Sequence, residues 1–152
     1  MAHFLLIHGA CHGGWCWERI VPLLEAAGHR VEAPDLPGHG ADPTPLSELS
    51  MEAARHAFYQ DADDPTFDMA FDRIGPEPVH VFREKADLTE EKFGRVSRAY
   101  INCAQDKAIG PALQREMVEA TPCDPVFTLD SGHSPFLTAP DALAQILLSL
   151  GE

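Results

Sequence analysis

Short apolar runs alternate along the first part of the chain with stretches of helical periodicity. Residues 3–8 hold a continuous apolar run closed by Gly9, which predicts a buried strand covered on both faces. Residues 15–27 carry apolar side chains at helical spacing, and Gly28 follows where a helix-ending glycine sits. Residues 30–34 read as a second strand. This order predicts a βαβ unit with a right-handed crossover.

The last third of the chain shows the same alternation of strand and helix patterns. Residues 99–103 and 125–129 predict strands, and residues 111–120 and 141–150 predict helices. Asp141 falls in the first turn of the last helix, where a negative charge is favourable. The predicted fold class is therefore α/β, with a mainly parallel sheet flanked by helices.

The middle of the chain is helical without an intervening strand pattern. Apolar spacing predicts a helix over residues 48–60, and Asp64 before Pro65 predicts the N-cap and first position of another. We expect residues 1–152 to form one domain, with 48–94 as a helical cap inserted in it. The acidic run 61–64 is typical of a solvated face. The large apolar residues expected to form the core of the cap are Phe58, Tyr59, Phe67, Met69 and Phe71.

Charge and composition narrow the classes of partner. Among 152 residues, 11 Lys and Arg stand against 24 Asp and Glu, a net charge of −13, which argues against nucleic-acid and anionic membrane surfaces. The first apolar run is far too short to span a bilayer, and no basic segment precedes it, so we expect neither a membrane span nor a secretory signal. The four cysteines fit no zinc pattern, which predicts free thiols in a reducing cytoplasm.

Reactive side chains follow three of the predicted strands. The first strand leads into a glycine-punctuated loop over residues 8–14, Asp106 follows the strand 99–103, and His133 follows the strand 125–129. Ligands of open α/β sheets bind at the carboxyl ends of the strands. An acid on one such loop and a histidine on the next is the order of an acid–base pair in α/β-hydrolases, where the acid fixes the imidazole tautomer.

Two segments carry a family resemblance. Residues 3–40 contain HFLLIHGACHGGWCW and GHRVEAPDLPGHG, and residues 98–133 contain YINCAQDKAI. Both resemble the α/β-hydrolase superfamily, and more closely its plant methylesterase and hydroxynitrile lyase branch with the bacterial relatives; residues 55–96 resemble the cap of that branch. The resemblance implies a carboxylic ester hydrolase of small esters, with Asp106 and His133 as acid and base and the Ala10 N–H in the oxyanion hole. It implies a small ester or aromatic ligand, and we expect no cofactor and no metal.

The nucleophile that the resemblance implies is missing. None of the six serines has glycine both two residues before and two residues after it, so the chain contains no G-x-S-x-G elbow. We expect the central strands and elbow of the family to be absent, with the junction between Leu46 and Ala53. His133 would then activate water directly, with weak turnover. The exposed strand edges would either join within one chain or pair across a homodimer, through sheet edges or strand exchange.

Three alternatives stay open at this point. Cys11 lies in a G-x-C-x-G sequence beside His12, so it is either a thiolate nucleophile or a packed residue of the oxyanion loop. His8 and His12 have a spacing seen in metal sites, although they flank a glycine turn. A non-catalytic small-molecule-binding or assembly protein derived from the same fold is the alternative function.

Overall fold

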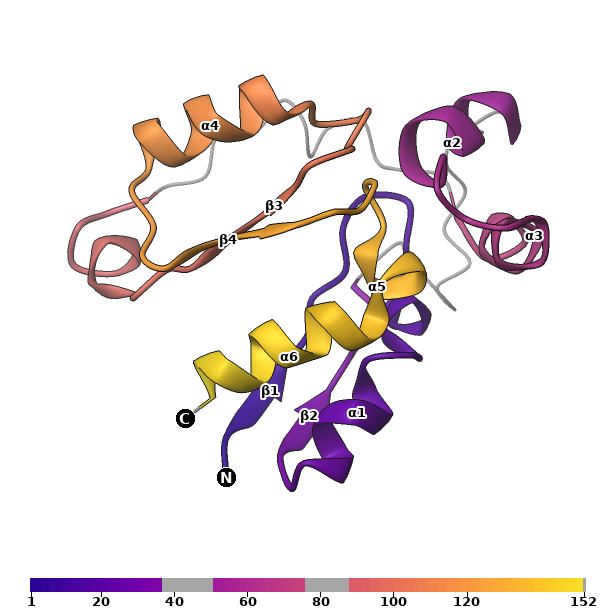
Figure 1. Ribbon diagram of the computed structural model, residues 1–152. Coiled ribbons are helices and arrows are strands. Elements are labelled where there is room, and N and C mark those ends of the chain that lie inside the picture. The colour runs from indigo at the N-terminus through magenta and orange to yellow at the C-terminus, as the bar shows by residue number, and fades with distance from the viewer. Residues whose placement is uncertain (37–50, 76–87, 152) are drawn as a thin grey trace.

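The four described strands form two separate parallel sheets. The structure, a computed structural model, describes residues 1–36, 51–75 and 88–151 (Figure 1). The strands are β1 (His3–Leu5), β2 (Arg30–Glu32), β3 (Tyr100–Cys103) and β4 (Val126–Leu129). β1 pairs with β2, and β3 pairs with β4, both in parallel. The parallel pairing was predicted, but the direct joining of the two halves into one sheet is wrong for these described strands.

Helices flank both sheets. The helical elements are η1 (Gly14–Trp17), α1 (Val21–Ala26), α2 (Met51–Phe58), α3 (Asp64–Phe71), η3 (Phe93–Arg95), α4 (Pro111–Ala120), α5 (Pro135–Thr138) and α6 (Pro140–Leu150). The helix predicted over 15–27 is split into η1 and α1. Pro22 lies in the first turn of α1, where the missing N–H breaks no hydrogen bond. Gly28 follows α1 with φ of 85°, a conformation that favours glycine.

One sequence prediction of a helix end was wrong, and one short helix was not predicted. The N-cap of α3 is Asp63 rather than Asp64, because the Asp63 carboxylate accepts a hydrogen bond from the Thr66 N–H at 2.9 Å. Asp64 and Pro65 therefore occupy the first two helical positions. The four-residue helix α5 was not predicted, since so short a segment shows no periodicity.

The main apolar core joins the two sheets. Its fully or nearly buried members lie in or next to β1, α1, β4 and α6, and they are Leu6, Ile20, Leu24, Leu129 and Leu143. Helix α6 packs against both α1 and β4, so the C-terminal helix ties the N-terminal βαβ unit to the β3–β4 pair. In Figure 1 the helix α6 lies beside β1, with β4 above it.

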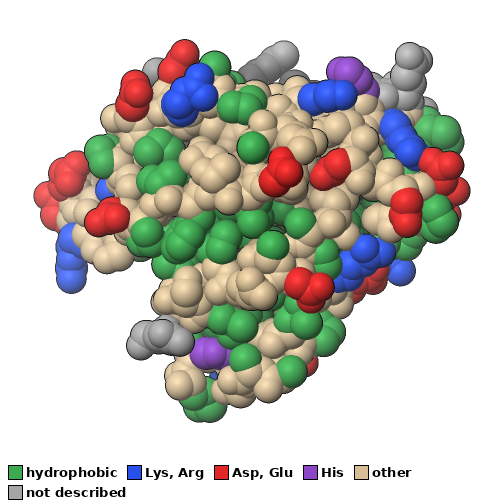
Figure 2. Space-filling model, viewed as in Figure 1, with side chains coloured by type: hydrophobic (Ala, Val, Ile, Leu, Met, Phe, Trp, Pro, Cys, Tyr) green, Lys and Arg blue, Asp and Glu red, His purple; other side chains and the backbone are tan. Residues whose placement is uncertain are grey.

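One face of the first strand is open in the described part of the chain. Leu5 is 60% exposed and Ile7 is 46% exposed, although the sequence predicted a strand covered on both faces. Leu6, which points to the other side, is buried under α1 and α6 with the core described above. Figure 2 shows further apolar side chains gathered in a band across the middle of the molecule, where the β3–β4 unit lies above α6.

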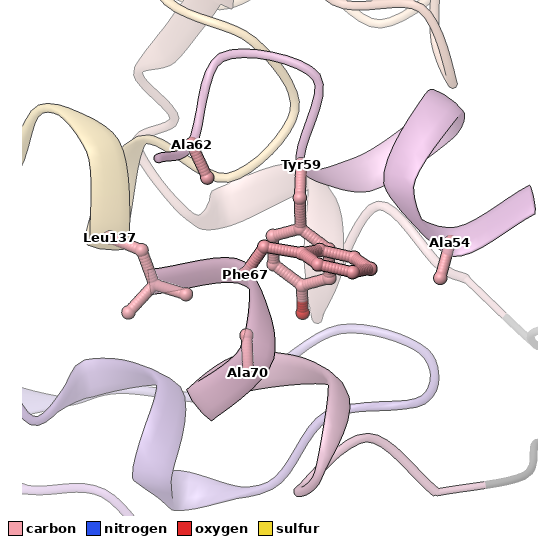
Figure 3. Close-up of a cluster of buried hydrophobic side chains, with 6 residues drawn as sticks. All are labelled: Ala54, Tyr59, Ala62, Phe67, Ala70 and Leu137. Atoms are coloured by element: carbon pink, nitrogen blue, oxygen red, sulfur yellow. The ribbon is translucent and has the colours of Figure 1, made fainter. Parts of the chain in front are cut away.

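A second apolar cluster holds the middle segment in place. Tyr59 and Phe67 pack with their rings 5.9 Å apart, and Leu137 of α5 reaches the same cluster (Figure 3). Its small members are Ala54, Ala62 and Ala70. The predicted apolar core of the middle segment is confirmed, with Phe58, Met69 and Phe71 packed partly buried around it. In Figure 1 the helices α2 and α3 lie beyond the carboxyl ends of β3 and β4. No described helix is long and apolar enough to cross a membrane.

Candidate active site

Asp106 and His133 meet at the carboxyl ends of β3 and β4. His133 Nδ1 lies 3.0 Å from Asp106 Oδ2 and 3.1 Å from Oδ1. The Asp106 carboxylate also accepts backbone hydrogen bonds from Ala108 at 2.8 Å and Ile109 at 2.9 Å. The Asp106 side chain is 7% exposed and that of His133 is 26% exposed. The acid is thus buried and fixed by its own loop, while the imidazole reaches the surface.

The hydrogen bond to Asp106 determines which His133 nitrogen is available. An ionised carboxylate only accepts, so Nδ1 carries the proton and Nε2 of the neutral ring keeps its lone pair. Among the described residues no group is hydrogen-bonded to His133 Nε2. The Phe58 ring packs on the imidazole at 5.2 Å with an interplanar angle of 30°. The result is an oriented base with a free acceptor nitrogen.

The loop after β1 is held by hydrogen bonds within the N-terminal unit. His8 Nδ1 donates to the Gly9 carbonyl at 2.9 Å, and its Nε2 accepts from the Leu36 N–H at 3.0 Å. Gly14 donates its N–H to Asp35 at 2.7 Å. A side chain at Gly14 would collide with the Ala33 carbonyl oxygen, so glycine is required where the loop crosses the end of β2. His8 therefore has a structural role.

His12 connects this loop to the middle segment. Its Nδ1 donates to the Ala10 carbonyl at 2.7 Å, and its Nε2 accepts from the Tyr59 hydroxyl at 2.7 Å. Burial raises the pKa of Tyr59, which keeps the phenol protonated as a donor. Ala10 itself is exposed, next to Cys11, which is buried and has φ of 65°. Because both His12 nitrogens are engaged in this way, the contacts favour packing over the pairing of Cys11 with His12.

The cysteines and histidines form no metal centre in the described part of the chain, where no three His, Cys, Asp or Glu side chains are placed to share an ion. No disulfide joins any two of the four cysteines, all of which lie in the described residues. Burial raises the pKa of the Cys16 thiol to about 12. Burial also raises the pKa of the Cys103 thiol, and this effect exceeds the lowering of the same pKa by the Ser131 hydroxyl. Both thiols are therefore protonated at neutral pH and are poor nucleophiles.

Three side chains near the pair had no signal in the sequence. Gln114 bonds the backbone of Cys103, Gln60 bonds the loop of Asp106, and Asp61 bonds the loop of His133. The acidic run 61–64 was interpreted as a solvated face. That interpretation is incomplete, because Asp61 is exposed but bonds Gly132 and Asp63 caps α3. These contacts join residues far apart in the chain, which periodicity does not reveal.

The α/β-hydrolase family model matches residues 4–82, just over half of the chain. The chain belongs to the α/β-hydrolase family. Within that family it is similar to plant methylesterases. Salicylic acid-binding protein 2 of Nicotiana tabacum is 60% identical over 47 residues, which are 31% of this chain but only 18% of the tobacco protein.

Two longer comparisons extend over the whole chain. Methylesterase 9 of Arabidopsis thaliana is 23% identical over 253 residues, covering 100% of this chain and 99% of that protein. Because the chain has 152 residues, an internal part of that relative has no counterpart here. The crystal structure of the methylesterase MES16 from Arabidopsis superposes with a TM-score of 0.90 at 21% identity, covering 99% of this chain and 98% of that one. This likeness shows the fold.

Proposed function

We propose that the protein is a carboxylic ester hydrolase in which His133 acts as general base on water. The observation that carries the proposal is the Asp106–His133 pair, with Nδ1 bonded to the carboxylate and Nε2 left as acceptor. The similarity to methylesterases supports an ester as substrate. The exposed loop at Ala10 follows β1 at the same strand ends, which supports its N–H as the oxyanion donor.

The reaction follows from this geometry. A water molecule at Nε2 gives one proton to His133 as its oxygen bonds to the ester carbonyl carbon. The carbonyl oxygen becomes an oxyanion that accepts the Ala10 N–H, and the imidazolium is stabilised by Asp106. The intermediate then breaks its bond to the alkoxy group, which takes the proton from His133 and leaves as the alcohol. The acid product remains, and the base is restored.

We attribute the use of water to the loss of the serine elbow. The alignment to methylesterase 9 leaves an internal part of the relative unmatched, and no serine of this chain has the elbow glycines. We place the junction between Leu46 and Ala53, outside the described residues except at its end. General-base catalysis contributes only about 10²–10⁴-fold. We therefore expect slow turnover of small, activated esters.

Hydrolysis of p-nitrophenyl acetate and butyrate tests the base directly. We expect His133→Ala to remove most of the activity, because Nε2 is the only proton acceptor that the mechanism uses. Asp106→Asn is expected to be nearly as damaging. Its amide oxygen would keep the Ala108 and Ile109 N–H groups, turning the NH₂ toward His133 Nδ1 and forcing the proton onto Nε2.

The matched control is His56→Ala, which removes an exposed histidine of α2 and so corrects for unspecific imidazole catalysis. Equal rates for wild type, His133→Ala and His56→Ala would reject the mechanism. Binding of an ester analogue without any hydrolysis would instead indicate a non-catalytic small-molecule-binding protein.

We also propose that open strand edges pair between two copies of the chain. Among the described strands β1 pairs only with β2 and β3 only with β4, so each of the four strands has one edge without a partner strand. Light scattering after gel filtration should give the mass of a dimer. A monomeric mass at all protein concentrations would contradict this pairing.

Two further assignments complete the proposal. The position of α2 and α3 beyond the strand ends supports residues 48–94 as a cap over the site (Figure 1). The absence of a disulfide between the four cysteines, all of them described, supports a cytoplasmic location. Fractionation of cells that express the chain, with thiol labelling before lysis, tests the location.

A further inference from the structure

Four consecutive residues at the end of α2 and just after it contact four residues in the three loops of the candidate site. Phe58 packs on the imidazole of His133, and the Tyr59 hydroxyl hydrogen-bonds the imidazole of His12. Gln60 bonds the backbone of Gln105, and Asp61 bonds the backbone of Gly132. Every loop of the site is thus touched by one short segment, which we call the 58–61 segment.

Asp61 holds the loop of the base. Its Oδ2 accepts the Gly132 N–H at 2.6 Å and the Thr138 hydroxyl at 3.0 Å. Gly132 is buried and directly precedes His133. A Cβ at Gly132 would collide with the Gln60 amide and lie 2.5 Å from Asp61 Oδ1, so the segment and the loop are in direct contact. The carboxylate makes the backbone bond charge-assisted and short.

Gln60 holds the loop of the acid. Its Nε2 donates to the Gln105 carbonyl at 2.6 Å, and Gln105 directly precedes Asp106. The Gln105 N–H in turn donates to the Ser131 carbonyl at 3.0 Å. Neighbouring side chains of the 58–61 segment therefore bind the residue before the acid and the residue before the base.

We infer that Gln60 and Asp61 are positioning residues that fix the Asp106–His133 pair in its bonded geometry. The inference rests on the proposed function for its effect on rate. Bonds of 3.0 and 3.1 Å to a carboxylate are lost when one loop moves by about 1 Å, a displacement that can cost about 10²-fold in rate. Asp61 is exposed, so its side chain contributes little to the core, and its effect should fall on loop geometry.

The variants separate hydrogen bonding from charge. Asp61→Ala removes the acceptor, whereas Asp61→Asn keeps one carbonyl oxygen able to accept both bonds and loses only the charge. Thr138→Val is the control, because it deletes the second donor to Asp61 and leaves the Gly132 bond. Gln60→Met removes the bond to Gln105 at similar side-chain length, and gives a second test should Asp61→Ala not fold.

Nitrogen-15 NMR of the His133 ring and hydrogen exchange of the Gly132 amide are the readouts that need no activity. In the wild type we expect the Nδ1–H tautomer and a protected amide. Asp61→Ala should mix the two tautomers and speed exchange at Gly132 by about tenfold or more. Asp61→Asn and Thr138→Val should stay close to the wild type, and Gln60→Met should mix the tautomers as well.

Steady-state kinetics then tests whether the position of the Asp106–His133 pair affects the rate of ester hydrolysis. We expect Asp61→Ala to lower kcat for p-nitrophenyl acetate about 10-fold or more with little change in KM, and Asp61→Asn to restore most of it. If the wild type hydrolyses no ester, the proposed function fails while the tautomer readout still decides the positioning role. An unchanged tautomer and unchanged Gly132 exchange in both Asp61→Ala and Gln60→Met would overturn the inference.

Discussion

Replacing Gln114 with methionine should destabilise the protein strongly, although the two side chains have similar volumes. Gln114 is 2% exposed, and its amide makes three hydrogen bonds to backbone. Oε1 accepts the Cys103 N–H at 2.9 Å, and Nε2 donates to the carbonyls of Cys103 at 2.9 Å and Ile109 at 2.7 Å. Methionine has similar length but makes none of these bonds.

The position of these bonds explains their importance. Tyr100 and Ala104 donate their N–H groups toward β4, so the backbone groups of Cys103 between them point to the opposite edge of β3. The Gln114 amide occupies that edge as a strand backbone would. The third bond fixes Ile109, at the end of the loop that holds Asp106. Without Gln114 these groups stay buried and unpaired.

The expected loss is about 3 kcal/mol, from three bonds at about 1 kcal/mol each, and unpaired buried groups would increase it. With a urea m value of about 1–3 kcal/mol/M, the midpoint of unfolding should fall by about 1–3 M. Circular dichroism in urea at pH 7 measures this. Arg115→Met is the control, because Arg115 is exposed on the same helix and should change stability by about 0.5 kcal/mol or less. A loss for Gln114→Met no greater than that of the control would show that these three hydrogen bonds do not stabilise the fold.

Three other predictions concern stability. Burial raises the pKa of Cys16 from 9.0 to about 12, so between these pH values the folded state keeps a proton that the unfolded state loses. The free energy of unfolding should therefore be highest below pH 9 and fall toward pH 12, by up to about 1.4 kcal/mol per pH unit. Cys16→Ala should flatten this decline, as measured by urea titrations at several pH values. Tyr59→Phe removes the donor to buried His12 and should cost about 1–3 kcal/mol, so a variant as stable as the wild type would argue against the bond. Asp63→Ala should lower Tm more than Asp68→Ala, since only Asp63 caps α3 through Thr66; equal values would contradict the cap.

Local patterns in the sequence were sufficient for much of the fold. The helix α4 has the bounds predicted for it, and β3, β4 and α6 begin within one residue of their predicted positions. These elements have strong periodicity and clear end signals such as Pro111 and Gly151. Burial was harder to predict, because the exposure of Leu5 and Ile7 depends on which neighbour covers the strand.

The candidate site was predictable only in part. Asp106 and His133 follow strands that run in parallel, so their proximity follows from topology. The roles of Gln60, Asp61 and Gln114 did not follow from the sequence, because each bonds the backbone of a distant segment. Backbone groups look the same in every sequence, so no residue pattern marks them as partners.

The initial phase of p-nitrophenyl acetate hydrolysis decides whether His133 activates water in place of a serine. When the enzyme concentration is close to the concentration of released product, direct attack by water predicts a linear release of p-nitrophenolate from the first turnover. It also predicts an unchanged protein mass and a rate that is lost in His133→Ala. A burst of one p-nitrophenolate per chain with an acylated residue, or the same rate in His133→Ala, would contradict it.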